Sequence, residues 1–258
     1  RVEVRNGFKK PILDSQDPAA FVEHRARLTA GYSKDKLGFK LSIQDVRVWG
    51  EVGQINKSDN LLSVHEAYGD YKASSVSTFR IGRQELAYDG HRFIGTLNWA
   101  AQARAFDAIR YIYKNDSTGL SFDLALTLNQ NGGETGAPEP ANLTGTTYTQ
   151  GGGKQDNTIF NLTLPKTQQL AYIKKKFKGG DVAFMFVNDI NQDITTERLY
   201  NQQHFGLTPN YKVGDIKLGA QAYYSMGDAG INGVGDKVDL SGYMFNLTVQ
   251  HTKLPGKP

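Results

Sequence analysis

The stretch Leu240–His251 reads LSGYMFNLTVQH, and its apolar and polar side chains alternate with few exceptions. Because successive residues of a strand point to opposite faces of a sheet, a period of two predicts a strand with one apolar face. That face would carry Tyr243, Phe245, Leu247 and Val249, and the other Gly242, Asn246, Thr248 and Gln250. The stretches 120–129 and 216–225 repeat the pattern. The sequence therefore predicts an all-β fold.

The connections between the expected strands alternate between short and long. Short turns are expected at 33–36, 73–76, 115–118, 178–181 and 213–215. Longer connections are expected at 9–20, 50–60, 89–104, 131–166, 190–199 and 227–239. In a barrel that crosses a bilayer, the periplasmic turns are short and the extracellular loops can be long. The alternation favours an antiparallel transmembrane β-barrel over a soluble sandwich, which has no reason to sort its loops.

Composition agrees with this fold and excludes other classes. The chain has 258 residues, of which 39% are hydrophobic, and its mean hydropathy is -0.48. No apolar run approaches the roughly 20 residues that a spanning helix needs. The net charge of +4 is too small to indicate nucleic-acid binding, and without cysteine there is no disulfide framework.

About twelve strands are expected, each of the roughly nine to eleven residues that a tilted membrane strand needs. They would begin near residues 1, 21, 36, 62, 76, 105, 119, 167, 181, 200, 216 and 240. The final residues 254–258 resemble another periplasmic turn and not the aromatic-ended strand usual in such barrels. We therefore expect residues 1–258 to form a single outer-membrane barrel domain that is incomplete at both ends.

Charged side chains recur on the faces opposite the apolar ones. Arg80, for example, stands between Phe79 and Ile81. A charge facing lipid costs on the order of 2–4 kcal/mol near the midplane, so these side chains are expected to line the lumen. The candidates for a solute path are Arg25, Arg27, Lys40, Arg47, Arg80, Arg83, Glu85 and Arg110. The alternative is a ladder of ion pairs that stiffens the barrel wall.

The connection 89–104 combines polar side chains with small residues, so it is a candidate pore loop. The residues expected to contact a solute there are His91, Arg92, Trp99, Arg104 and the adjacent Asp107. Such a loop would fold into the pore as a constriction. The alternative is a lid over the extracellular mouth.

Two stretches break strict alternation. The polar phase slips by one within 44–49, which predicts a β-bulge, and residues 83–85 place polar groups on both faces. The alternative is that both strands pass above the membrane at these points.

Metal and catalytic motifs are weak. Asp189, Asn191 and Asp193 have the spacing that opens a calcium loop, but Ile194 stands at the glycine position and Tyr200 at the bidentate glutamate. The loop 227–239 also offers carboxylates. We expect no catalytic residues, no metal and no cofactor, with calcium in the extracellular loops as the alternative. An enzyme is not expected, since no nucleophile-elbow or zinc-protease motif occurs.

The most specific motifs lie between Arg80 and Arg110. They are Gly82-Arg-Gln-Glu-Leu86, Arg92-x-x-Gly95, Trp99 and Phe106-Asp107. This order resembles the alginate-export family of outer-membrane porins. The stretches 42–50 and 65–68 fit the strands that precede these motifs in the family, so the resemblance covers most of residues 20–130.

The resemblance implies a channel of about 18 strands in the outer membrane of a Gram-negative bacterium, within the size range of such barrels. It also implies passive export or uptake of an anionic polysaccharide such as alginate, or of small anionic solutes, through an anion-selective pore. An arginine fork holds a carboxylate bidentately, which suits this cargo. Other expected partners are outer-membrane lipid, lipopolysaccharide and envelope proteins, with no nucleic acid. The alternative function is a non-conducting barrel that acts as a structural or docking subunit.

Overall fold

The computed structural model describes residues 1–6, 17–51, 53–54, 62–129, 148–150, 153–155, 165–192, 198–231 and 236–252. Several predictions lie outside these residues. They are the calcium-loop positions Asp193 and Ile194, the terminal turn 254–258 and most of the connections 9–20, 50–60 and 131–166.

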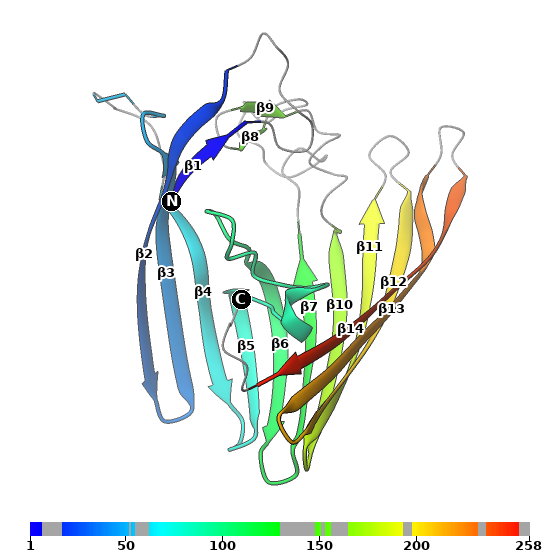
Figure 1. The fold of residues 1–258 in the computed structure, drawn as a ribbon. Helices are drawn as coiled ribbons and strands as arrows, with labels where there is room; N and C mark the ends of the chain where they lie inside the picture. Colours follow the sequence, from blue (N-terminus) through cyan, green and yellow to red (C-terminus); the bar gives the residue numbers. More distant parts are fainter. Residues whose placement is uncertain are drawn as a thin grey trace. The chain divides into compact units, whose positions relative to one another are not determined.

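The described chain is almost entirely β-structure (Figure 1). Twelve strands form one sheet, in the order β1-β2-β3-β4-β5-β6-β7-β10-β11-β12-β13-β14. Their bounds are β1 Val2–Arg5, β2 Ala19–Lys34, β3 Leu37–Val48, β4 Leu62–Lys72, β5 Ser77–Gln84, β6 Phe106–Asn115, β7 Leu120–Leu128, β10 Thr167–Phe177, β11 Gly180–Gln192, β12 Leu199–Val213, β13 Ile216–Ile231 and β14 Lys237–His251. A separate hairpin consists of β8, Tyr148–Gln150, and β9, Gly153–Gln155.

The all-β prediction and the strand positions are confirmed. Each strand begins within three residues of its predicted start, and the short turns lie where they were expected. Strand length was predicted less well. β1 has four residues, whereas β2 and β13 have sixteen. The hairpin β8–β9, inside the predicted long connection, was not foreseen.

Helical structure is minimal. Within the described ranges the one helical segment is the 3-10 turn η1, Asp89–His91, and no helix there is long and apolar enough to cross a membrane.

The chain divides into two compact units. The first unit comprises Arg1–Tyr71 and Gly82–Phe106, and the second comprises Lys72–Ile81 and Asp107–Pro258. In the first unit β2 and β3 pair without interruption from Glu23 opposite Val48 to the turn. In the second unit β10 to β14 follow one another as neighbouring antiparallel strands (Figure 1). The organisation as one barrel domain stays a prediction.

The predicted apolar faces are exposed. On β14 the side chain of Tyr243 is 91% exposed, and Phe245, Leu247 and Val249 are exposed beside it. Leu124, Leu126 and Leu128 on β7, and Leu218 and Tyr224 on β13, are exposed in the same way. Continuous apolar faces of this kind suit contact with lipid acyl chains, which need no hydrogen-bond partners.

The opposite face, called the polar face below, is only partly polar. It carries buried Ser42 and Gln44 in the first unit and Thr127 and His204 in the second. On β10 and β11, however, it also carries apolar side chains that are buried: Leu170, Tyr172, Ala183, Met185 and Val187. Alternation therefore identified the lipid-type face correctly but overstated the polarity of the other.

Candidate functional site

A β-bulge on β4 creates the centre of the site. Ser42 of β3 pairs with Glu66, but the next residue, Ile43, pairs with Val64, so His65 is an extra residue. Neighbouring residues of a regular strand point to opposite faces, whereas a bulge re-aims one of them. His65 and Glu66 are accordingly both buried, with 3% and 5% of their surface exposed.

The predicted bulge within 44–49 was wrong in position. β3 pairs regularly with β2 over its whole length, and the irregularity lies across the ladder, on β4. The pattern changes for another reason: the charged Asp45 and Arg47 lie on the same face as Ile43, while Val46 and Val48 lie on the face of Gln44.

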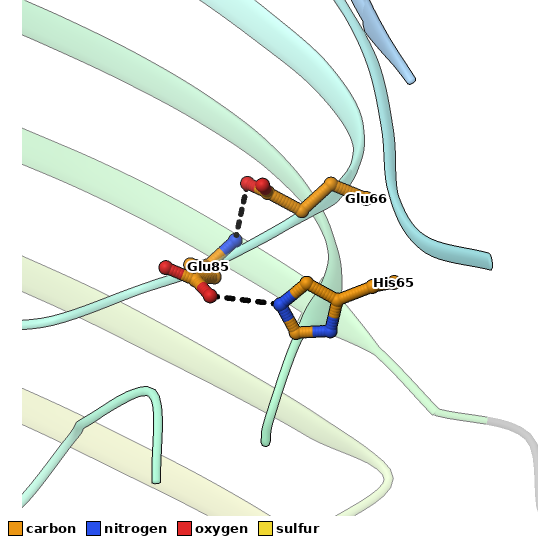
Figure 2. Close-up of side chains that lie close together, drawn as sticks. All are labelled: His65, Glu66 and Glu85. Carbon is orange, nitrogen blue, oxygen red and sulfur yellow. Dashed lines mark hydrogen bonds and ion pairs between the residues drawn. The ribbon is translucent and has the colours of Figure 1, made fainter. Parts of the chain in front are cut away.

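Close approach of β5 to β4 brings a third ionisable group to the bulge. Gly82 has a φ of +123°, and a Cβ atom there would lie 2.3 Å from the carbonyl oxygen of Ala67. Only glycine fits this backbone without strain. Glu85, three residues later, then lies with its Oε1 atom 2.7 Å from His65 Nε2, and its backbone N–H donates to Glu66 Oε1 at 3.4 Å (Figure 2).

Two cations neutralise the two carboxylates. Lys40 Nζ lies 2.5 Å from Glu66 Oε2, and Arg27 Nη1 lies 3.7 Å from Glu85 Oε1. The potential ligand atoms of His65, Glu66 and Glu85 lie within 4.8 Å of one another, a donor set of the kind that binds divalent cations. Both carboxylates are already paired with a cation, so in this structure the cluster is a charge-balanced ion-pair network.

Gln44 connects this network to the loop 89–104. Its Oε1 atom accepts hydrogen bonds from Arg27 Nε and Nη2 at 3.0 and 2.7 Å. Its Nε2 group donates to the carbonyl oxygen of Gln102 at 2.9 Å. The buried glutamine therefore ties the strand pair β2–β3 to the loop.

Two arginines hold the same loop. Arg25 Nη1 donates to the carbonyl oxygen of Ala101 at 3.2 Å, and Arg1 Nη1 donates to that of Trp99 at 3.0 Å. The loop thus packs on the polar face of β2 and β3, the face that carries Arg25, Arg27 and Lys40.

The loop itself has a defined structure. The Thr96 backbone N–H donates to His91 Nδ1 at 3.3 Å, and the Thr96 carbonyl accepts from Arg104 N at 2.6 Å. Asp89, His91, Leu97 and Ala103 all have positive φ, four of the five non-glycine residues that do so in the described chain. Such strain persists only where surrounding contacts impose it, and it often marks functional segments.

Of the predicted path residues, Arg25, Arg27, Lys40 and Glu85 come together in the first unit. Arg47 does not join them. It lies on the opposite face of β3, shared with Ile43, and pairs with Asp45. We therefore remove Arg47 from the candidate path.

The remaining path residues have separate surroundings. Arg80 alternates with the exposed Phe79 and Ile81, as expected for the polar face. Arg83 Nε donates to the carbonyl oxygen of Val64 at 3.1 Å. Arg110, in the second unit, forms an ion pair with Asp123. Pairing thus accounts for the charges of Arg27, Lys40 and Arg110.

The predicted loop residues differ in exposure and in their contacts. Arg92 and Trp99 are exposed, whereas the His91 ring bonds within its own loop. The Arg104 guanidinium lies over the Phe106 ring, 6.0 Å from its centroid, and desolvation lowers its pKa without removing its charge.

The grouping of Asp107 with the pore-loop residues was wrong. It is the second residue of β6, where it shares a face with the exposed Ile109. It is therefore a strand residue and not part of the loop.

Several site residues were missed from the sequence. His65 and Glu66 are adjacent ionisable residues inside an alternating strand, a signal that alternation cannot explain. Gln44 and Gln102 carry no such signal. In the second unit His204 Nδ1 lies 2.8 Å from Ser225 Oγ, and its Nε2 lies 3.5 Å from Asp189 Oδ2, on three neighbouring strands.

Replacement of Gln44 with alanine is expected to loosen the loop. The change leaves Arg27 and the Gln102 carbonyl without their buried partner, at a cost of about 1–2 kcal/mol. Trypsin cleavage at Arg92 or Arg104 in the detergent-solubilised protein should accelerate by about tenfold, since cleavage follows the open population.

Thr29→Val is the matched control for Gln44→Ala. Thr29 Oγ1 bonds Ser42 Oγ at 2.9 Å on the same strand pair but forms no hydrogen bond with the described residues of the loop. Equal acceleration in both variants would show that β2–β3 is destabilised as a whole and that Gln44 does not hold the loop.

Comparison with known proteins agrees with this geometry. Residues 14–130 match the family model described as alginate export. The match confirms the resemblance drawn from the motifs of Arg80–Arg110 and covers every site residue of the first unit except Arg1. Comparison with curated proteins gave no match.

Two solved structures of OmpT, an outer membrane protein of Vibrio cholerae folded in vitro, also match. The trimer form is 16% identical over 95% of this chain and 80% of that chain, with a TM-score of 0.39. The other structure is 15% identical over 95% of this chain and 79% of that chain, with a TM-score of 0.40.

The family match and the exposed apolar faces together locate the chain in the bacterial outer membrane, as predicted, and support a transport channel.

Proposed function

We propose that the protein is an outer-membrane channel for anionic polysaccharide such as alginate, or for small anionic solutes. The observation that supports this proposal most strongly is the position of the loop 89–104. Arginine and glutamine side chains hold this loop on the polar face of β2 and β3. In the proposed channel this loop is the constriction, and the sheet is part of a closed barrel of about 18 strands, within the range known for such proteins. The proposed transport needs no cofactor or catalytic residue.

Arg25 is the side chain best suited to contact the solute. Arg25 is exposed, and its hydrogen bond to Ala101 uses a neutral carbonyl. Among the described residues its charge forms no ion pair. A guanidinium binds a carboxylate bidentately, and in water such a contact is weak enough to release the solute. Arg27 and Lys40 contribute charge nearby but are held by Glu85 and Glu66.

The test is single-channel recording of the full-length protein in a planar bilayer, with an oligouronate added as blocker. Arg25→Gln should raise the half-blocking concentration by about threefold, since an exposed ion pair contributes roughly 0.5–1 kcal/mol. Arg47→Gln is the matched control, because this arginine lies on the opposite face of the neighbouring strand.

Anion-selective current that the oligouronate interrupts would support the proposal. Silence from a correctly inserted, heat-modifiable barrel would contradict it and favour the non-conducting structural or docking subunit, in which the same loop closes the pore. Equal effects of Arg25→Gln and Arg47→Gln would remove Arg25 from the path.

A further inference from the structure

Five lysines lie at the short-turn end of the polar face in the second unit. They are Lys114 on β6, Lys174 and Lys176 on β10, Lys212 on β12 and Lys217 on β13, here called the lysine row. The lysines of β10, β12 and β13 alternate with exposed apolar neighbours, such as Ile173 and Phe177 on β10 or Ile216 and Leu218 on β13. Lys114 and Lys174 both stand opposite Ser121, so Lys114 shares their face. Strand alternation therefore places all five on the polar face.

The charge of the row is only partly compensated. Lys174 pairs with Asp181 at 3.0 Å, and Lys114 pairs with Asp116 at 3.6 Å. Lys176, Lys212 and Lys217 are exposed and form no ion pair within the described part of the chain. Asp181 stands directly opposite Lys176 but is already paired with Lys174. The positive charge at this end of the face therefore exceeds the negative charge among the described residues.

The positions of two lysines destabilise the pairing of β12 with β13. Lys212 and Lys217 stand directly opposite each other in the β12–β13 ladder. Like charges at directly opposed positions destabilise a strand pair. A fold that needed only solubility would avoid this pairing, so the arrangement points to a ligand of opposite charge.

The type of cation indicates a transient contact. Lysine carries a compact, strongly hydrated charge on a flexible stem, whereas arginine forms rigid bidentate pairs. Clustered charge of one sign raises the local concentration of an oppositely charged solute and its association rate. A mobile polyanion is captured by such a surface without being held tightly.

We propose that the lysine row is the loading site for an anionic polysaccharide that approaches from the short-turn side. In outer-membrane barrels this side faces the periplasm, so the proposed direction of transport is export. The ligand class is a linear polyuronate, whose repeated carboxylates can exchange between Lys176, Lys212 and Lys217. This inference rests on the proposed channel function and adds the side from which the solute is captured.

The test measures block by a short linear oligouronate added to one side of the bilayer at a time. The chain has no cysteine, so Ser117→Cys in the β6–β7 turn and an impermeant charged thiol reagent identify the short-turn side. The variant combines Lys176→Gln, Lys212→Gln and Lys217→Gln. Lys175→Gln is the matched control, because Lys175 lies on the opposite face of β10 and its Nζ donates to the Thr118 carbonyl.

The triple variant should show an association rate about tenfold lower from the short-turn side at low salt, because steering is lost. The difference should shrink at high salt, where screening removes steering in both proteins. The rate from the long-loop side, the dissociation rate and the Lys175→Gln variant should stay close to wild type.

Two results would overturn the inference while leaving the channel proposal intact. One is wild-type block with unchanged association in the triple variant, and the other is wild-type block from the long-loop side alone. Absence of wild-type block from both sides would instead contradict the proposed solute class itself. Heat modifiability and unblocked conductance of each variant verify that it has folded.

Discussion

Replacement of Gly82 with valine is expected to prevent stable assembly of the first unit. The new Cβ would lie 2.3 Å from the Ala67 carbonyl oxygen, and the φ of +123° is one that valine rarely adopts. Backbone strain and a clash with backbone atoms together should cost about 3 kcal/mol or more. The expected result is loss of the heat-modifiable folded band on gels and a large shift of the urea unfolding midpoint.

Gly242→Val is the control for Gly82→Val. Gly242 lies within β14, where a Cβ would meet no atom within 4 Å. This variant should fold with wild-type stability to within about 0.5 kcal/mol, as surface substitutions usually do. If the two valine variants fold equally well, β5 does not approach β4 as closely as described, and the contact of Glu85 with His65 is wrong.

Glu66→Ala is expected to produce the second-largest loss of stability. Glu66 is buried at 5% exposure and pairs with Lys40, whose side chain is 34% exposed. Removing one partner of a fully buried pair costs about 3–5 kcal/mol. Because Lys40 reaches solvent in part, we expect about 2 kcal/mol, measured by urea unfolding in lipid vesicles.

A second variant separates the cost of an unpaired charge from the cost of lost packing. Lys40→Met combined with Glu66→Leu removes both charges and keeps most of the volume, so it should recover most of the stability lost in Glu66→Ala. Asp116→Ala, which breaks the exposed pair with Lys114, should have no measurable effect. A double variant less stable than Glu66→Ala would show that the pair itself is strongly stabilising.

The strand positions could be predicted because their determinants are local. Alternation in stretches such as 120–128 and 240–251 depends on neighbouring residues alone, since one face must be apolar. The short turns follow from residues that accept positive φ, as at Gly179 and Gly214. Neither feature requires knowledge of which strand lies beside which.

Face assignment from the sequence failed where the apolar face ends. Near the end of β3, Asp45 and Arg47 lie on the lipid-type face, whereas Val46 and Val48 lie on the other. At the start of β6 Asp107 also lies on the lipid-type face, so polarity no longer identifies the face there. Arg47 and Asp107 were misplaced for this reason. Their positions became clear from the pairing of Arg27 with Gln44 and from the strand bounds of β6.

The sequence by itself determined the strands, the short turns, the lipid-type face and the family resemblance. Tertiary structure alone decided the bulge at His65, the approach of β5 at Gly82 and the position of the loop. These features depend on register between strands and on contacts between distant residues, such as Gln44 and Gln102, which are 58 positions apart. No local pattern records such contacts, because their geometry exists only after the strands have paired.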